Sequence, residues 1–393
     1  MKLAMVGFGQ AGGKILDKFI EYDRETGSGI VRAAVAVNTA KADLMGLENV
    51  PQDNRVLIGQ SRVKGHGVGA DNELGAEIAE EDRDEIMGAV DNIPVHEVDA
   101  FLIIAGLGGG TGSGGAPVLA KHLKRIYTEP VYGLGVLPGA DEGGIYTLNA
   151  ARSFQTFVRE VDNLLVFDND AWRQSGESME GGYAEINQEI VTRFGILFGA
   201  GEVEPGTEVG ESVVDSSEII NTLSGGGVTT VGYAAENVES DTSSGGFLSK
   251  LRGGDRREPE DAAATTNRIT SLVRKAALGR LTLPCEIEGA ERALLVTAGP
   301  PAFLNRKGIE RGRKWLEEQT GSMEVRGGDY PVPQSQKVAS VVMLSGVTNV
   351  PRIKELQQVA IEAQDNIDEI RAESEENLEQ LVEDDDDELE PLF

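Results

Sequence analysis

The chain has 393 residues and a formal net charge of −30, with 66 Asp and Glu against 36 Lys and Arg. The length allows two or three domains, and such an acidic excess argues against nucleic acid or an anionic lipid surface as a partner. No apolar run approaches the roughly 20 residues of a bilayer span, and the single cysteine excludes a disulfide framework. We therefore expect a cytoplasmic protein without direct membrane insertion.

Short apolar runs alternate with helical patterns over the first 170 residues. The first run leads straight into a glycine loop, as a buried strand does and a signal peptide does not. This alternation predicts a parallel sheet with helices on both faces, whose ligands bind at the carboxyl ends of the strands. The predicted strands are 2–8, 31–37, 56–58, 101–105, 131–137 and 164–167.

A long helix is predicted next, over about 179–198, from apolar residues at three- and four-residue spacing. A loop rich in Gly and Glu follows at 199–210, and a polar stretch at 235–264 predicts a mobile surface loop. A last helix is predicted from Ile353 to about Val382, followed by an end too charged to pack. Further strands are predicted at 229–233, 293–298 and 338–344.

Two glycine loops follow predicted strands. Gly7–Gly12 fits G-x-G-x-x-G, but a NAD site also needs an acid closing the second strand, and that strand ends at Asn38-Thr39. A P-loop fails too, because Phe8 and Ile15 stand where it needs Gly and a hydroxyl residue. The second loop, Gly108–Gly115, opens a helix whose N–H groups suit a phosphate. Two such loops at adjacent strand ends imply a polyphosphate ligand.

The run Gly-Gly-Gly-Thr-Gly-Ser-Gly at 108–114 resembles the signature loop of the tubulin and FtsZ superfamily. Gly9-Gln10-Ala11-Gly12 resembles the first nucleotide loop of tubulin. The acidic tail and the segment 138–143 resemble CetZ, the tubulin-like group of halophilic archaea, which also fits the acid-rich, lysine-poor composition.

The resemblance covers about 1–350 and implies an α/β, tubulin/FtsZ-like fold with a Rossmann-type parallel sheet. It divides the chain into a GTPase domain, a long central helix, a smaller α+β C-terminal activation domain, a C-terminal helix and an acidic disordered tail. The boundaries expected for these five parts are 1–175, 176–200, 201–352, 353–382 and 383–393.

The resemblance also implies the residues that bind GTP or GDP. A third loop, Gly65–Gly75, is similar to the one that meets the γ-phosphate and Mg²⁺, which would be bound through the nucleotide phosphates without a protein metal site. Glu142 matches the acid that holds the ribose, and Asn169 and Asn187 match the pair that reads guanine. Read without the resemblance, Asn169 is a helix cap and Asn187 a solvated helix position. The remaining expected contacts are Gln10, Ala11, Gly12, Gly13, Lys14, Ala70, Asp71, Asn72, Gly108, Gly109, Gly110, Thr111, Gly112 and Ser113.

The contacts of two residues in this region are not decided by the sequence. Tyr146 stands where FtsZ proteins have an Arg, so the contact made there is not predicted. His66, in the third loop, either touches phosphate or makes a hydrogen bond within the loop.

Asp215 and Glu218 form a carboxylate pair on one helix face. By themselves they describe an ordinary helix cap with Glu at the third helical position. The resemblance implies instead the synergy loop, whose two acids are catalytic toward the nucleotide of the next subunit. Val213 stands where the family has Asn, so part of this loop diverges.

Together these features predict a GTP-hydrolysing, tubulin-like cytoskeletal protein that polymerises head to tail and controls cell shape. Its partners would be itself and, through the tail, other proteins. The alternatives are an FtsZ-like division-ring protein, a nucleotide-gated adaptor and, remotely, an NAD(P)-dependent oxidoreductase.

Overall fold

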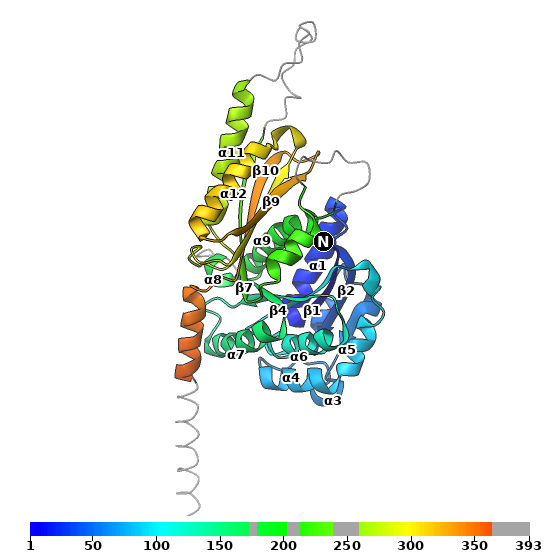
Figure 1. The fold of residues 1–393 in the computed structure, drawn as a ribbon. Helices are drawn as coiled ribbons and strands as arrows, with labels where there is room; N and C mark the ends of the chain where they lie inside the picture. Colours follow the sequence, from blue (N-terminus) through cyan, green and yellow to red (C-terminus); the bar gives the residue numbers. More distant parts are fainter. Residues whose placement is uncertain (173–178, 203–212, 239–258, 364–393) are drawn as a thin grey trace, which may run out of the picture.

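The computed structural model describes residues 1–172, 179–202, 213–238 and 259–363. Within these ranges ten strands form one sheet, in the order β3-β2-β1-β4-β5-β6-β7-β10-β8-β9 (Figure 1). The strands are β1 (Leu3–Phe8), β2 (Val31–Asn38), β3 (Arg55–Leu57), β4 (Ala100–Gly106), β5 (Val131–Leu137), β6 (Asn163–Asp168), β7 (Val228–Asn237), β8 (Arg292–Gly299), β9 (Glu324–Pro331) and β10 (Lys337–Ser345). The helices are α1 (Gly9–Thr26), α2 (Lys41–Met45), α3 (Gln60–Val63), α4 (Asn72–Glu81), α5 (Arg83–Val90), α6 (Thr111–Ile126), α7 (Gly144–Glu160), α8 (Asn169–Trp172), α9 (Met179–Gly199), α10 (Ser216–Leu223), α11 (Pro259–Leu278), α12 (Arg306–Thr320) and a further helix at 351–363.

The half of the sheet from β3 to β7 is parallel, which confirms the fold class predicted from the alternation of strands and helices. β10 then joins antiparallel to both β7 and β8, and β9 adds parallel to β8. All nine strands predicted from apolar runs are present, and β7 extends to Asn237. The carboxyl ends of β1, β4, β5 and β6 therefore meet at one edge of the sheet.

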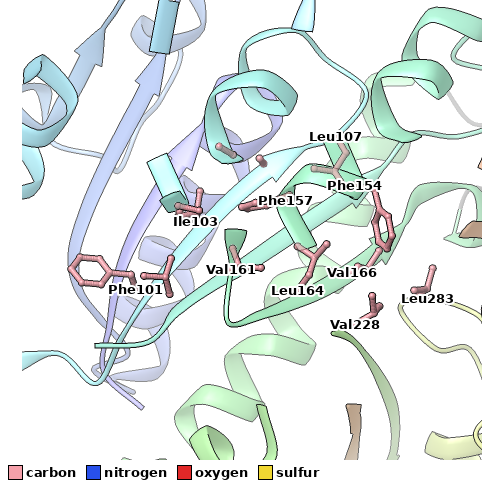
Figure 2. Close-up of a cluster of buried hydrophobic side chains, with 14 of the residues drawn as sticks. Phe101, Ile103, Leu107, Phe154, Phe157, Val161, Leu164, Val166, Val228 and Leu283 are labelled. Atoms are coloured by element: carbon pink, nitrogen blue, oxygen red, sulfur yellow. The ribbon is translucent and has the colours of Figure 1, made fainter. Parts of the chain in front are cut away.

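Alternate side chains of the central strands enter two different apolar layers. On β4, Phe101 and Ile103 face the layer that contains the buried side of α6 and α7, whereas Leu102 and Ile104 face the layer that contains α1 and α9. Figure 2 shows the first of these layers, where Phe154 and Phe157 of α7 lie over the sheet. Burying a large apolar side chain stabilises a fold by about 1.5–3 kcal/mol, so both helical layers hold the strand ends in place.

The helix α9 confirms the long helix predicted over 179–198. It contacts α1, which packs on the parallel strands, and it also contacts β7 and β10, where the antiparallel pairing begins. In Figure 1 it lies between these two parts of the molecule. The five domain boundaries given above stay a prediction.

Three elements and one loop differ from the expectation. β9, α11 and α12 were not predicted, and β9 was missed because Glu324–Pro331 has no apolar run. The loop expected over 235–264 is wrong at both ends: Ala235–Asn237 pairs with β10, and α11 begins at Pro259. Pairing with a neighbouring strand satisfies the backbone there and outweighs the polar composition.

Several expectations fall on other parts of the chain. Residues 203–210 of the predicted Gly/Glu loop, 239–258 of the surface loop, 364–382 of the last helix and the acidic tail 383–393 lie outside the described residues. Gly199, which was assigned to the Gly/Glu loop, is the last residue of α9. None of the helices in the described ranges combines the length and apolar character of a membrane span.

Candidate nucleotide-binding site

A cavity of about 540 Å³ lies where β1, β4, β5 and β6 end. This volume is typical of small-molecule sites. The fold brings together residues from widely separated stretches of the chain around it. The predicted binding residues that line it are Gln10, Ala11, Lys14, Ala70, Gly108, Gly109, Gly110, Thr111, Gly112, Glu142, Asn169 and Asn187.

Five predicted binding residues lie outside this lining and have other contacts. A Cβ on Gly12 would come within 2.1 Å of the Ile104 carbonyl oxygen, so Gly12 allows α1 to pack closely on β4. A Cβ on Gly13 would meet the side chain of Leu47 at 3.6 Å, an ordinary packing distance. The other three residues lie at the ends of the second and third loops: Asp71 and Asn72 at the start of α4, and Ser113 in the first turn of α6.

The second glycine loop presents backbone to the cavity. A Cβ on Gly109 would meet no atom within 4 Å, so this residue faces open space inside the site. Ser113 turns its Oγ back to the carbonyl oxygens of Gly109 and Gly110. The helix α6 begins at Thr111 without a side-chain cap, so its first N–H groups remain available for an anion.

Gly110 lines the cavity and also packs against the third loop. Its Cβ position is 2.4 Å from Val68 Cγ2 and 2.9 Å from the backbone nitrogen of Asp71, so the third loop packs directly against it. Asp71 caps α4, since its Oδ1 accepts a hydrogen bond from the Leu74 N–H at 2.9 Å. Asn72 is buried in the first turn of that helix. These two residues shape the third loop, and its segment 67–70 lines the cavity.

Asn149 of α7 ties the second and third loops together, and the sequence reading missed it. Its buried Nδ2 donates to the carbonyl oxygens of Ala70 at 2.7 Å and Gly108 at 3.0 Å. Ala70 has a φ of 64°, a strained conformation for a residue with a side chain. The only signal in the sequence was a polar residue within the buried face of a helix.

The far end of the cavity carries amides and apolar groups. The Oδ1 of Asn169 is buried and has no hydrogen-bond partner among the described residues. An unpaired buried acceptor costs about 1–3 kcal/mol, and a ligand with N–H donors, such as a guanine edge, would satisfy it. Asn187 and Tyr183 of α9 also line the cavity, as does Tyr146, and Tyr183 was not predicted.

Glu142, matched to the ribose contact, also organises its own turn. Its Oε1 accepts a hydrogen bond from the Gly139 N–H at 2.6 Å, and the side chain lines the cavity. Lys14 and His66 bring basic groups to the lining of a strongly acidic chain. His66 thus lies where a phosphate contact is geometrically available.

The carboxylates of Asp215 and Glu218 are not among the residues that line this cavity. Asp215 is exposed and caps α10, because its Oδ1 accepts from the Glu218 N–H at 3.0 Å. A hydrogen bond from the Ser217 hydroxyl lowers the pKa of Asp215, whereas burial and the charge of Asp215 raise the pKa of Glu218. The structure therefore confirms the capping geometry and separates the titrations of the two acids.

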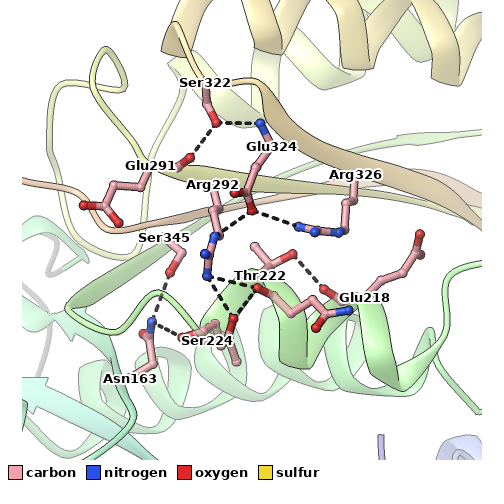
Figure 3. Close-up of polar contacts among 12 residues, drawn as sticks. Asn163, Glu218, Thr222, Ser224, Glu291, Arg292, Ser322, Glu324, Arg326 and Ser345 are labelled. Carbon is pink, nitrogen blue, oxygen red and sulfur yellow. Dashed lines mark hydrogen bonds and ion pairs between the residues drawn. The ribbon is translucent and has the colours of Figure 1, made fainter.

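A polar network holds α10 against β8 and β9 (Figure 3). Arg292 of β8 donates through Nη1 to Ser224 Oγ at 2.9 Å and pairs through Nε with Glu324 of β9 at 2.8 Å. Arg326 of β9 lies 3.7 Å from the same Glu324 carboxylate. This network fixes the helix that carries Glu218.

The described part of the chain contains no cluster of His, Cys, Asp and Glu residues that could hold a metal ion.

The chain resembles known families over most of its length. The Tubulin/FtsZ family, GTPase domain, matches residues 2–177, and the Tubulin-like CetZ, C-terminal domain, matches residues 176–362. Tubulin-like protein CetZ1 of Haloferax volcanii is 82% identical over 375 residues, covering 94% of each chain. Tubulin-like protein CetZ3 of the same organism is 63% identical over 393 residues, covering 100% of each.

Solved structures agree with these matches. The GDP-bound monomer of CetZ1 from Haloferax volcanii has a TM-score of 0.83 and 77% identity, covering 93% of this chain and 100% of that one. CetZ2 from Haloferax volcanii, solved as a GTPγS-bound protofilament, has a TM-score of 0.82 and 46% identity, covering 94% and 100%. An empty FtsZ dimer from M. jannaschii, at 21% identity, a TM-score of 0.66 and 88% coverage of each chain, shares the fold.

Proposed function

This chain belongs to the CetZ group of the tubulin/FtsZ superfamily, a group of tubulin-like cytoskeletal GTPases, and from this premise we propose how its own residues bind and hydrolyse GTP. The triphosphate lies between Gln10–Lys14 and Gly108–Gly112, and Asn169 and Asn187 read the guanine. The unpartnered buried Oδ1 of Asn169, at the end of a cavity lined by two glycine loops, carries this proposal. The GDP-bound CetZ1 and the GTPγS-bound CetZ2 support it as similar proteins with these ligands.

Hydrolysis is completed between two subunits. Asp215 and Glu218 lie outside the lining of their own chain's cavity, and Asp215 is exposed, so both are available to a neighbour. Two carboxylates whose pKa values are pushed apart divide the roles of base and orienter. We assign the base to Glu218 and the orientation of the attacking water to Asp215.

Mg²⁺ is proposed to be bound through the nucleotide phosphates, which agrees with the oxygen-rich, phosphate-dependent way in which this ion usually binds. When bound, it would neutralise charge on the phosphate oxygens. Asp71 is an acid of the third loop, which the resemblance places next to Mg²⁺. Its carboxylate caps α4, so we assign it no direct metal contact.

The filaments are proposed to control cell shape. The alternative, a division ring, is less well supported, because the chain is 82% identical to a CetZ protein and its likeness to FtsZ is at 21% identity. Membership of this family also argues against the oxidoreductase alternative. A nucleotide-gated adaptor that does not polymerise would differ in failing to sediment with GTP.

Mixing two inactive variants tests the shared site. Glu218→Gln removes the base and leaves the cavity intact, whereas Gly110→Val disturbs the cavity and leaves the acids intact. Each variant alone should hydrolyse GTP slowly at most. The mixture should regain turnover as the two co-sediment, because the acids of the Gly110→Val variant meet the nucleotide of the Glu218→Gln variant. Wild-type turnover per subunit should also rise with protein concentration. A turnover rate independent of concentration would refute hydrolysis between subunits.

A further inference from the structure

A second cavity, of about 510 Å³, lies between α11 and α12, apart from the nucleotide site. Three cationic side chains line it, Arg274, Arg311 and Lys314, together with one acid, Glu318. Trp315 supplies an aromatic face, and the Arg274 guanidinium lies 5.6 Å from the centre of its ring. Three small polar side chains complete the lining, namely Asn267, Thr270 and Ser271.

The three cations of this groove are exposed and form no ion pair with the parts of the chain that the structure describes. The other arginines of α12 form ion pairs within that helix: Arg306 with Glu310 at 2.9 Å and Arg313 with Glu317 at 3.8 Å. The groove therefore carries three cations against one acid, an excess of positive charge on a chain whose net charge is −30. Such a surface favours a ligand rich in carboxylates.

The chain itself contains a segment with this chemistry. Residues 383–388 are six consecutive acids, and Leu389, Leu392 and Phe393 follow within five positions. Carboxylates suit the guanidinium groups and the ammonium group, and the apolar residues suit the face of Trp315. The two parts of this segment match the two parts of the groove.

We propose that the groove between α11 and α12 binds the acidic segment Glu383–Phe393 of a neighbouring copy of this chain. Figure 1 shows the helix at 351–363 running away from α11 and α12, so it leads away from the groove of its own chain. Filament formation, on which this proposal rests, places other copies within reach. The contact would link successive or adjacent subunits in addition to the shared nucleotide site.

The salt dependence of binding distinguishes the charged part of the contact from its apolar part. Exposed charge pairs weaken as the Debye length falls to about 3 Å at 1 M salt, whereas apolar contact persists. A peptide with the sequence of residues 383–393 should bind less tightly as KCl rises, without losing all binding. The same peptide without Leu392 and Phe393 should lose its binding at high KCl.

The direct test uses this peptide, labelled for fluorescence anisotropy, and a chain that lacks 383–393. Binding of the peptide requires neither nucleotide nor a filament. A loss of peptide binding can therefore be distinguished from a failure of the chain to polymerise. Arg311→Glu with Lys314→Glu should weaken binding by about tenfold or more. The matched reversal Lys307→Glu with Arg313→Glu, on the same helix outside the groove, should change it by less than about twofold. No binding, or equal binding by both variants, would overturn the proposal.

A carbodiimide cross-link shows whether the contact joins two copies. A full chain carrying Lys314→Arg supplies the acidic segment without the reactive amine, and the chain that lacks 383–393 supplies Lys314. A cross-linked peptide joining Lys314 to the segment in this mixture can form only between copies, and we expect it under polymerising conditions. Its absence from the mixture, with the same cross-link present in the unmodified full chain, would show binding within one copy and overturn the proposal.

Discussion

The guanidinium Nε of Arg352 lies 3.5 Å from Oδ1 of Asp168, the residue that precedes Asn169. Arg352 also donates through Nη2 to the carbonyl oxygen of Pro138 at 3.0 Å, and Pro138 lines the nucleotide cavity. The start of the helix at 351–363 is thereby joined to the part of the cavity that Pro138 and Asn169 line. Burial raises the pKa of Asp168 to about 6, although the charge of Arg352 opposes the increase.

This pair predicts a pH-dependent stability. Because the folded pKa of Asp168 is raised from 3.8 to about 6, its favourable contribution is complete below pH 3.8 and is lost as the pH rises through 6. Relative to Asp168→Asn, the wild type should lose about 3 kcal/mol of unfolding free energy across this range. Chemical denaturation at a series of pH values measures it, and Arg352→Met should move the loss to higher pH. A difference that does not vary with pH would contradict the prediction.

Substitutions at two adjacent glycines distinguish an effect on nucleotide binding from an effect on packing. Gly109→Ala adds a methyl group into open space, so the nucleotide-free chain should keep its stability while GTP affinity falls. Gly110→Ala adds it against Val68 and Asp71, so the free chain itself should lose about 1–3 kcal/mol. Denaturation of the nucleotide-free variants and titration with GTP measure the two effects. Unchanged GTP affinity in Gly109→Ala would place the phosphates elsewhere.

Asn149 is a positioning residue for both phosphate loops. Asn149→Ala leaves the carbonyl oxygens of Ala70 and Gly108 without this donor and should cost about 1–3 kcal/mol of stability. Because we propose that these loops hold the nucleotide, KM for GTP should rise more than kcat falls. The matched control is Asn92→Ala, which removes an exposed amide that donates to one helix carbonyl, that of Gly88. Equal effects of both changes on KM would exclude the positioning role.

Asp215 both caps α10 and is proposed to orient water. Asp215→Asn keeps a capping oxygen and should leave stability unchanged, whereas Asp215→Ala should cost about 1 kcal/mol. Both variants should lose turnover if the charge acts on the neighbour's nucleotide. Thermal unfolding and GTPase assays of the two variants separate these roles. Full turnover in Asp215→Asn would leave only the capping role.

Glu218 should set the acid limb of the pH–rate profile. Burial and the Asp215 charge raise its pKa above the ordinary 4.5, so turnover should fall as the pH drops toward this raised value. Glu218→Gln should bind GTP normally, form persistent filaments and hydrolyse slowly at every pH. In Asp215→Asn the remaining activity should extend to lower pH, because one cause of the raised pKa is gone. An identical acid limb in Asp215→Asn and wild type would assign the limb to another group.

Much of the fold was readable from local patterns. β1 and β4 are short apolar runs that are buried on both faces, and a glycine loop follows each of them directly, so neither strand nor loop needs a distant residue to be recognised. β9 escaped detection because its residues acquire a strand conformation by pairing with β8 rather than from their own composition. The first end of the loop expected at 235–264 was wrong for the same reason, since β10 supplies the partner of Ala235–Asn237.

The positions of nine strands, the two glycine loops and the acids of α10 could be predicted from the sequence, since spacing within a few residues encodes all of them. Which of the two lining glycines has open space around its Cβ position depends on the tertiary structure, because Gly109 and Gly110 differ in what packs against them. The tertiary structure also assigned Asn149 to two loops and Arg352 to Asp168, pairs separated by 41 or more residues. Such contacts depend on how the helices cross the sheet, and no local pattern records that geometry.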